Sequence, residues 1–323
     1  MTRRRRLSSP PSIGSGAFRD AAAGWLHRRF GVEVSAGAVA ACVGTKELVA
    51  SVPHLLRLRD PGRDTVLYPA VSYPTYAMGA MLAGCRAVPV AVDDGWHLDL
   101  SSIDDGDAGR ALCLWVNVPA NPTGAVDPLG PAAAWGRAHG VPVFSDECYV
   151  EFTWAGTGHT ILESGREGVV AVHSLSKRSN LAGLRAGFYA GDGELVRFLA
   201  EVRKHAGLMV PGPVQLAAGV ALADDEHVSV QRGRYRERLD LMRAAFVAAG
   251  VDVPAPEGTF YLWVPAPDGD AWAFTERLAK EAGVLVSPGE FYGPAGAGHV
   301  RVAAVQPTAD LARAAECLAA LSW

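Results

Sequence analysis

A lysine that follows two hydroxyl side chains is the most informative feature of this 323-residue chain. The three residues are Ser174, Ser176 and Lys177, and the apolar run before them, 169–173, is typical of a buried strand. Crevices open at the carboxyl edge of a parallel sheet, so Lys177 is well placed to meet a ligand. A desolvated lysine becomes a nucleophile that traps carbonyls. The hydroxyls and Arg185 would suit a phosphate, although most lysines are solvated surface groups.

A second candidate for phosphate binding is Gly44-Thr45-Lys46, which ends one predicted strand and opens a helix. Gly44 permits close approach of the backbone, and we expect Thr45 both to cap the helix and to offer its hydroxyl. Free amides at a helix start bind phosphate. An ordinary capped helix is the competing interpretation.

The loop 117–124 follows a predicted strand and contains two X-Pro bonds before Gly124. Proline restricts the preceding residue to extended backbone, and glycine then allows the chain to turn. We expect this rigid loop to direct the Asn121 amide into the crevice. A plain turn would explain the prolines and the glycine, but not the two asparagines beside them.

An acid, Asp146, follows the apolar run 141–144. A carboxylate at the end of a buried strand is costly unless it is paired, and a protonated pyridine nitrogen is one suitable partner. Tyr149, three residues on, could donate to a phenolate oxygen of the same ring. The competing interpretation is that Asp146 caps a helix.

Arg301 lies in the middle of a predicted strand, 299–303. An arginine fork binds a carboxylate through two parallel hydrogen bonds. The competing interpretation is a solvent-facing arginine on an edge strand. Together the five features offer partners for a phosphate, a pyridine nitrogen, an aldehyde and a substrate carboxylate. We therefore predict that the cofactor is pyridoxal 5′-phosphate (PLP).

The elements that must position these residues alternate between strands and helices, which predicts an α/β fold with a mostly parallel, doubly wound sheet. The predicted strands are 39–43, 65–67, 87–91, 111–116, 141–144, 169–173 and 187–190, and the predicted helices are 18–30, 46–57, 75–83 and 131–139.

After residue 193 the pattern changes to longer helices, including the charged run 226–243, with strands at 259–264, 284–286 and 299–303. We predict a large cofactor-binding domain over 12–228 and a smaller C-terminal α+β domain over 229–323, which the short segment 1–11 completes. The boundary then falls inside a long helix.

Net charge and cysteine content limit the partners and the compartment that we expect. The net charge of −4 gives no electrostatic reason to expect nucleic acid or a membrane as a partner. The basic run 3–6 is not followed by an apolar segment, so we expect no export signal. The five cysteines are scattered without a C-x-x-C pair, which favours structural thiols in a reducing cytoplasm and no metal site.

The combined motifs resemble those of the class I/II aminotransferases, which are PLP-dependent transferases of fold type I. The resemblance covers nearly all of the chain from about residue 11. The matching segments are Gly44-Thr45, Tyr73-Pro74-x-Tyr76, Asn121-Pro122-Thr123-Gly124, Asp146-x-x-Tyr149, Ser174-x-Ser176-Lys177, Arg185-x-Gly187 and Arg301.

Segments 145–149, 173–183, 203–211 and 291–296 are more narrowly similar to the actinobacterial N-succinyldiaminopimelate aminotransferases. This similarity implies a cytoplasmic homodimer in lysine and diaminopimelate biosynthesis. It would exchange an amino group between glutamate/2-oxoglutarate and N-succinyl-2-amino-6-oxopimelate. Another aminotransferase specificity or a C–S lyase stays open, because the same lysine, aspartate and arginine would serve either reaction.

The resemblance also implies residue roles. Lys177 would bind the cofactor aldehyde and move a proton, Asp146 would keep the pyridine nitrogen protonated, and Tyr149 would contact the phenolic oxygen. The other implied contacts are Gly44, Thr45, Lys46, Ser174, Ser176 and Arg185 with the phosphate, Tyr73 or Tyr76 with the ring face, Asn121 with the phenolic oxygen, Arg301 and Asn121 with the substrate α-carboxylate, and Arg178 or the Arg203-Lys204 pair with a distal carboxylate.

The chain departs from the family pattern near its N-terminus. Counting back from Gly14, Ser9 stands where the family usually has a tyrosine that reaches the phosphate of the neighbouring subunit. The family's additional N-terminal arm has no counterpart, and 1–7 resembles nothing in it. A degenerate homologue that binds PLP weakly is therefore a third interpretation.

Overall fold

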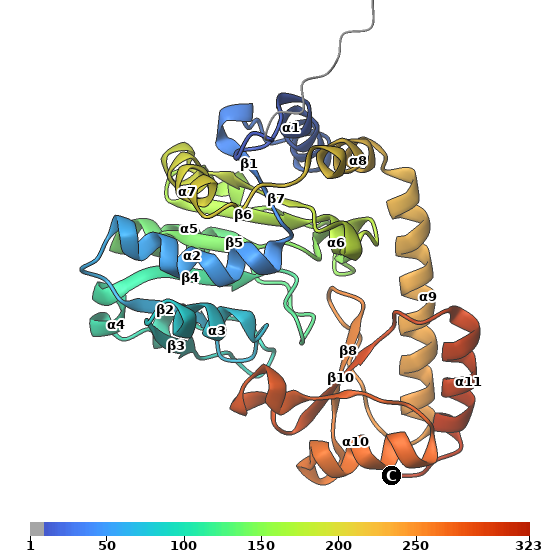
Figure 1. Ribbon diagram of the computed structural model, residues 1–323. Helices are drawn as coiled ribbons and strands as arrows, with labels where there is room; N and C mark the ends of the chain where they lie inside the picture. The colour runs from blue at the N-terminus through green and yellow to red at the C-terminus, as the bar shows by residue number, and fades with distance from the viewer. Residues whose placement is uncertain (1–9) are drawn as a thin grey trace, which may run out of the picture.

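The computed structural model describes residues 10–323 and contains one large sheet and one small sheet (Figure 1). The strands of the large sheet are β1 (Val39–Cys42), β2 (Thr65–Pro69), β3 (Arg86–Val90), β4 (Ala111–Asn117), β5 (Val143–Asp146), β6 (Val169–Ser174) and β7 (Gly187–Gly191). Their order is β1-β7-β6-β5-β4-β2-β3. Strands β3, β2, β4, β5 and β6 pair in parallel, whereas β7 is antiparallel to both of its neighbours.

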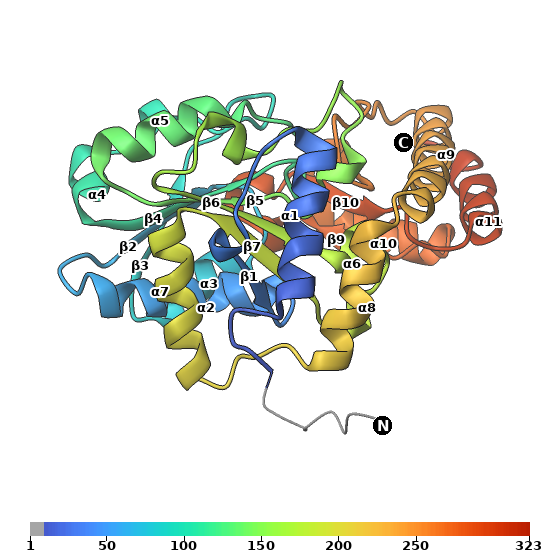
Figure 2. The ribbon, with the colours of Figure 1, turned by 90° about the horizontal axis from the view of Figure 1, so that it is seen from above.

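Helices cover both faces of this sheet. They are α1 (Gly16–Phe30), α2 (Thr45–Arg59), α3 (Thr75–Leu82), α4 (Asp105–Arg110), α5 (Leu129–His139), α6 (Leu175–Arg178), α7 (Gly193–His205) and α8 (Gly212–Ala223). Strand residues alternate between two cores: Val169 and Ala171 pack with α1, α5 and α8, while Val170 and Val172 pack with α2, α3 and α7. Figure 2 shows α1 and α8 side by side. Apolar residues on both strand faces are what a doubly covered parallel sheet requires.

The predicted fold class is confirmed, and all seven predicted strands of the large sheet are present with shifts of at most a few residues at their ends. Four predicted helices correspond to α1, α2, α3 and α5. The short helix α4 was not predicted, because its sequence, DGDAGR, is polar and contains two glycines. The Asp104 side chain caps it by accepting from the Gly106 N–H.

The C-terminal part has its own core around a three-stranded antiparallel sheet in the order β8-β10-β9. Its elements are α9 (Glu226–Ala248), β8 (Tyr261–Pro265), α10 (Ala271–Glu281), β9 (Ser287–Pro288), β10 (His299–Ala303) and α11 (Thr308–Ala319). Helix α9 runs from the side of the large sheet to the small one (Figure 1). The domain boundary at 228/229 stays a prediction and would lie in its first turn. No helix within residues 10–323 is long and apolar enough to cross a membrane.

The predicted strand 284–286 is wrong. The strand in that region, β9, begins at Ser287 and pairs with Val300 and Arg301 of β10. Leu285 is 84% exposed and does not contribute to the core. An apolar run therefore predicted a strand where the chain has an irregular segment.

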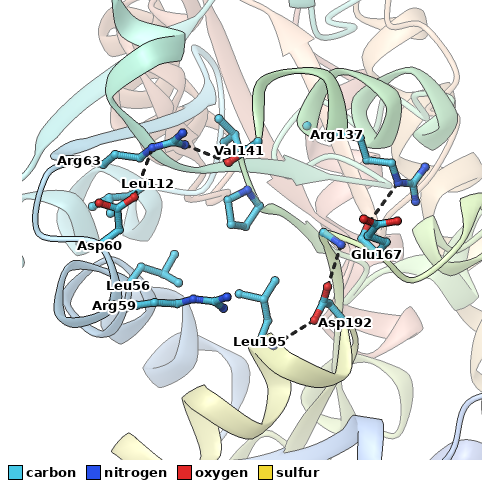
Figure 3. Close-up of a pocket in the computed structure, with 14 residues that line it drawn as sticks. Leu56, Arg59, Asp60, Arg63, Leu112, Arg137, Val141, Glu167, Asp192 and Leu195 are labelled. Atoms are coloured by element: carbon cyan, nitrogen blue, oxygen red, sulfur yellow. Dashed lines mark hydrogen bonds and ion pairs between the residues drawn. The ribbon is translucent and has the colours of Figure 1, made fainter.

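A cavity of about 480 Å³ opens at the amino edge of the parallel strands (Figure 3). Arg63 donates to the carbonyls of Ala111 and Gly140, and Arg137 donates to those of Ser164, Gly165 and Glu167. Arg59 pairs with Glu194. These arginines link the ends of helices to the starts of strands, and all three already have partners within the protein. The arrangement favours a structural role for this edge of the sheet.

A buried ion pair joins α7 to the start of α2. Arg203 is 1% exposed, and its Nη1 and Nη2 atoms lie 2.5 and 2.7 Å from Oε1 and Oε2 of Glu47. Glu47 also accepts from the Val43 N–H at 3.3 Å, so the pair stabilises the turn between β1 and α2. Arg203 is therefore committed to Glu47 and does not serve a distal substrate carboxylate.

Replacing Arg203 with methionine should lower the free energy of unfolding by about 3 kcal/mol, because it leaves the Glu47 carboxylate partly buried without its partner. Urea unfolding followed by circular dichroism measures the loss. The matched control is Lys204→Met, which removes the surface pair with Glu201 and should cost less than about 1 kcal/mol. Equal losses in the two variants would contradict this assignment.

Candidate active site

A cavity of about 310 Å³ opens at the carboxyl edge of the parallel strands, opposite the edge in Figure 3. It gathers most of the residues predicted from the sequence. The cavity is lined by Thr45, Lys46, Tyr73, Asn117, Asn121, Asp146, Cys148, Tyr149, Ser174, Ser176, Lys177, Ala182, Arg185, Tyr261 and Arg301.

Lys177 is presented by the short helix α6, which begins directly after β6. The Ser174 hydroxyl caps this helix by accepting from the Ser176 N–H at 3.2 Å. Burial lowers the pKa of Lys177, and the like charge of Arg301 lowers it further. The lysine Nζ lies 5.8 Å from the centroid of the Tyr149 ring. A buried amine with a lowered pKa is suited to nucleophilic attack on a carbonyl.

The start of α2 and Arg185 form the anion-binding end of the cavity. Gly44 has φ +71°, and a Cβ on it would overlap the Arg185 guanidinium. Arg185 itself adopts a left-handed backbone, φ +53°, and its Nη1 donates to the Ala182 carbonyl at 2.9 Å. Because the first turn of a helix leaves amides without helical partners, this end suits a phosphate.

One detail of the prediction for this turn is wrong. The residue that caps α2 is Gly44, and Thr45 is the first helical residue. The positive φ of Gly44 places the helix start one residue earlier than a threonine cap would. The Thr45 hydroxyl instead accepts from the Cys148 thiol at 3.3 Å.

Asp146 is the last residue of β5 and is 5% exposed. Its Oδ2 accepts from the Tyr76 hydroxyl at 2.9 Å, and its Oδ1 accepts from the Cys148 N–H at 3.2 Å. Burial raises the pKa of Asp146, while these hydrogen bonds and the Lys177 charge lower it. The N-cap interpretation is wrong, because the next helical turn, η3 (Val150–Phe152), is preceded by Tyr149.

Asn117 fixes the loop that carries Asn121. The Asn117 side chain accepts from the Asn121 N–H at 2.8 Å and donates to the Asp146 carbonyl at 2.8 Å. Both X-Pro bonds of the loop, Val118-Pro119 and Asn121-Pro122, are cis. The Asn121 amide lines the cavity, as predicted from the sequence.

Arg301 projects from β10, the central strand of the small sheet, so the edge-strand interpretation is wrong. Its Nη1 donates to the Asn121 Oδ1 at 3.0 Å. The guanidinium carbon lies 4.2 Å from the ring centroid of Tyr261 and 4.9 Å from that of Tyr292. A guanidinium held between aromatic rings and an amide keeps its fork in a fixed orientation.

Tyr261 is a site residue that sequence reasoning missed. Its hydroxyl lies 2.8 Å from the Tyr149 hydroxyl, and either can be the donor. Tyr261 is on β8, which pairs with the strand of Arg301. Both strands were predicted, but their pairing depends on non-local contacts, and no local motif marks Tyr261.

The structure also separates the two tyrosines of the 73–76 motif. Tyr73 lines the cavity, with the Lys46 Nζ 5.7 Å from its ring centroid. Tyr76 is fully buried, stacks on Trp115 at 5.2 Å and donates to Asp146. Tyr73 is therefore the one that can meet the face of a bound ring, and Tyr76 supports the acid.

The prediction that Arg178 binds a distal carboxylate is wrong. Successive helical residues point about 100° apart, so Arg178 leaves α6 away from the cavity that Lys177 enters. It is 4% exposed, and it donates to Asp225 at 2.6 Å, to Glu151 at 3.3 Å and to the Ala221 carbonyl at 2.6 Å. The prediction on Ser9 lies outside the described residues.

Comparisons with known proteins identify the family of this chain. A family model described as aminotransferase class I and II matches residues 2–318. The 4-dedimethylamino-4-oxo-anhydrotetracycline transaminase OxyQ of Streptomyces rimosus is 43% identical over 95% of this chain and 84% of its own length. The LL-diaminopimelate aminotransferase of Desulforudis audaxviator is 37% identical over 96% of this chain and 81% of its own.

A solved structure has a similar fold. It is described as a probable N-succinyldiaminopimelate aminotransferase from Thermus thermophilus, and it superposes with a TM-score of 0.86 at 33% identity, covering 95% of this chain and 84% of that one. The buried lysine, the acid, the anion site and the arginine fork lie in one cavity of this fold. The chain belongs to the class I and II aminotransferases and is a PLP-dependent transaminase.

Proposed function

We propose that this aminotransferase exchanges an amino group between glutamate/2-oxoglutarate and N-succinyl-2-amino-6-oxopimelate. The observation that carries the proposal is the Arg301–Asn121 hydrogen bond in the same cavity as Lys177, since it provides a fixed fork for an α-carboxylate. The relatives named for diaminopimelate substrates support this choice. The homodimer and the cytoplasmic location stay predictions.

The residues of the cavity fit PLP. The buried Asp146 carboxyl has a raised pKa, and a cationic pyridine N–H would stabilise its ionised form. Lys177 would hold the aldehyde carbon, and Tyr149 and Asn121 would contact the phenolic oxygen. The groups that would hold the phosphate are Ser174, Ser176, Arg185 and the amides of Gly44, Thr45 and Lys46. When bound, the cofactor supplies an electron sink for charge that develops at the substrate Cα.

The protein side chains would then do three things. Arg301 orients the substrate by its α-carboxylate, which sets the direction of the Cα–H bond. The Lys177 Nζ, with its lowered pKa, would accept the proton from the substrate Cα and deliver it to the carbon of the cofactor aldehyde. Asp146, which accepts a hydrogen bond from the Tyr76 hydroxyl, would pair its negative charge with the ring nitrogen.

With Arg178 and Arg203 committed elsewhere, Lys46 becomes our candidate for the distal carboxylate. Its ammonium group lies over the Tyr73 ring at the cavity wall. A lysine presents a compact charge on a flexible stem, which can follow a long substrate. This assignment replaces the sequence-based one and retains a substrate with a distal carboxylate.

A second candidate is an acceptor that carries a bulky ketone in place of a distal carboxylate. The 43% identity with the anhydrotetracycline transaminase favours it. Under this alternative Lys46 would serve the cofactor phosphate alone. The C–S lyase interpretation would use the same lysine and acid but would release ammonia and a keto acid.

A panel of substrates distinguishes these functions. Glutamate should convert the bound pyridoxal form to the pyridoxamine form, and N-succinyl-2-amino-6-oxopimelate should restore it, both followed by visible absorbance in single-turnover mixing. Restoration by a polycyclic ketone alone would favour the second candidate. Pyruvate release from cystathionine would identify a lyase.

Replacing Arg301 with lysine should lower kcat/KM for glutamate by about 10- to 100-fold, because the two parallel hydrogen bonds to the α-carboxylate are lost. Steady-state kinetics measures this loss. As the control, the affinity for PLP, measured by titration of the apoprotein, should change little. A matching loss of PLP affinity would show that Arg301 acts on the cofactor.

Replacing Lys46 with methionine should raise KM for the succinylated substrate about tenfold and leave KM for alanine within about twofold, because alanine has no distal carboxylate. Lys46→Arg, which keeps the charge, is the matched control. If both substrates lose equally and PLP binds more weakly, Lys46 belongs to the phosphate and not to the substrate.

A further inference from the structure

Two buried titratable side chains next to the cavity take no part in the roles above. Glu147 follows Asp146 at the end of β5, and His173 precedes Ser174 on the neighbouring strand β6. Glu147 is 1% exposed and His173 is 3% exposed. Each is therefore bonded through the backbone to a residue that lines the cofactor site.

The two side chains face each other. The Glu147 Oε2 lies 3.3 Å from the His173 Nε2, and neither atom makes a hydrogen bond within residues 10–323. The other carboxyl oxygen, Oε1, accepts from the Ile161 N–H at 2.8 Å. Buried polar atoms need partners, so one proton between Oε2 and Nε2 would satisfy both.

Three aromatic rings pack around His173. Its ring lies 4.9 Å from that of Trp25, 5.0 Å from that of Phe188 and 6.2 Å from that of Phe30, measured between centroids. A charged imidazolium is costly in such a place, and burial lowers the pKa of His173 to about 3. Burial likewise raises the pKa of Glu147 to about 8. Geometry and burial both favour a neutral pair.

The other charged groups do not favour an ionised Glu147. The titratable or charged side chains around it are Asp146, Cys148, Glu151, Glu163 and Arg178. Three are acids, and the charge of Glu163 raises the pKa of Glu147 further. The cation, Arg178, is already paired with Glu151 and Asp225. Burial raises the pKa of the Cys148 thiol and keeps it uncharged.

We propose that Glu147 carries a proton and donates a hydrogen bond to His173, and that this neutral pair holds the ends of β5 and β6 together without placing a second negative charge beside Asp146. Both are positioning residues, since they act on the cofactor through Asp146 and Ser174. The inference rests on the cofactor site and is independent of which amino acid is the substrate.

The proton can be located directly. Infrared spectra of the holoenzyme at pH 6.5 should contain the C=O band of a protonated carboxyl, and the band should disappear in Glu147→Gln (E147Q). The matched control, Glu163→Gln, removes a nearby exposed acid and should retain the band. A wild-type spectrum without this contribution, as an ion pair would give, overturns the proposal.

Thermal unfolding of the full chain tests the same proton by linkage. The unfolded carboxyl loses its proton near pH 4.5 and the folded one near pH 8, so stability that is present at low pH is lost as pH rises toward 8. Between pH 6.5 and 8, Tm of the wild type should therefore fall by a few degrees relative to E147Q, and the gap should then stay constant up to pH 9. His173 stays neutral in the folded state over this range. Parallel curves for the two proteins would overturn the proposal.

The affinity for PLP distinguishes a positioning role of the Glu147–His173 pair from a role in stability alone. Ionised Glu147 would leave a buried charge without a cation partner between the ends of β5 and β6, and would loosen the positions of Asp146 and Ser174. The Kd for PLP of the wild type relative to that of E147Q should therefore rise about tenfold from pH 6.5 to 9. A ratio that is independent of pH would remove the pair from this role.

Discussion

The burial of polar groups at one edge of the sheet is the constraint on which the site depends. The carboxyl ends of β4, β5 and β6 bring Asn117, Asp146 and Ser174 together, next to α6 and the start of α2. In this position a carboxylate must find donors and an amine loses part of its charge. The chemistry of Asp146 and Lys177 is therefore set by the depth of the cavity as much as by residue type.

Much of this arrangement could be predicted from the sequence, because buried parallel strands appear as uninterrupted apolar runs. The residue after each run then lies at the carboxyl edge, which is how Lys177, Asp146 and Asn121 were found. Side-chain direction within an element was harder to predict. Lys177 and Arg178 are neighbours on α6, yet one enters the cavity and the other is buried against α8.

Contacts between distant segments could not be predicted. Tyr261 joins the site because β8 pairs with β10, and Tyr76 supports Asp146 because α3 packs against the sheet. The strand expected at 284–286 was misplaced for the same reason, since β9 is defined by its pairing with β10 and not by apolar residues. Local patterns identify the elements, and packing between them determines which side chains meet.

The hydrogen bond between Arg301 and Asn121 links two parts of the chain that have separate cores. Arg301 belongs to the small sheet, whose core includes Phe246 and Leu262, whereas Asn121 and Lys177 are held by the large sheet. The group that we propose orients the substrate is thus carried by a different hydrophobic core from the group that we propose reacts. A substitution in the small core can therefore move the Arg301 fork while Lys177 and Asp146 keep their positions in the large sheet.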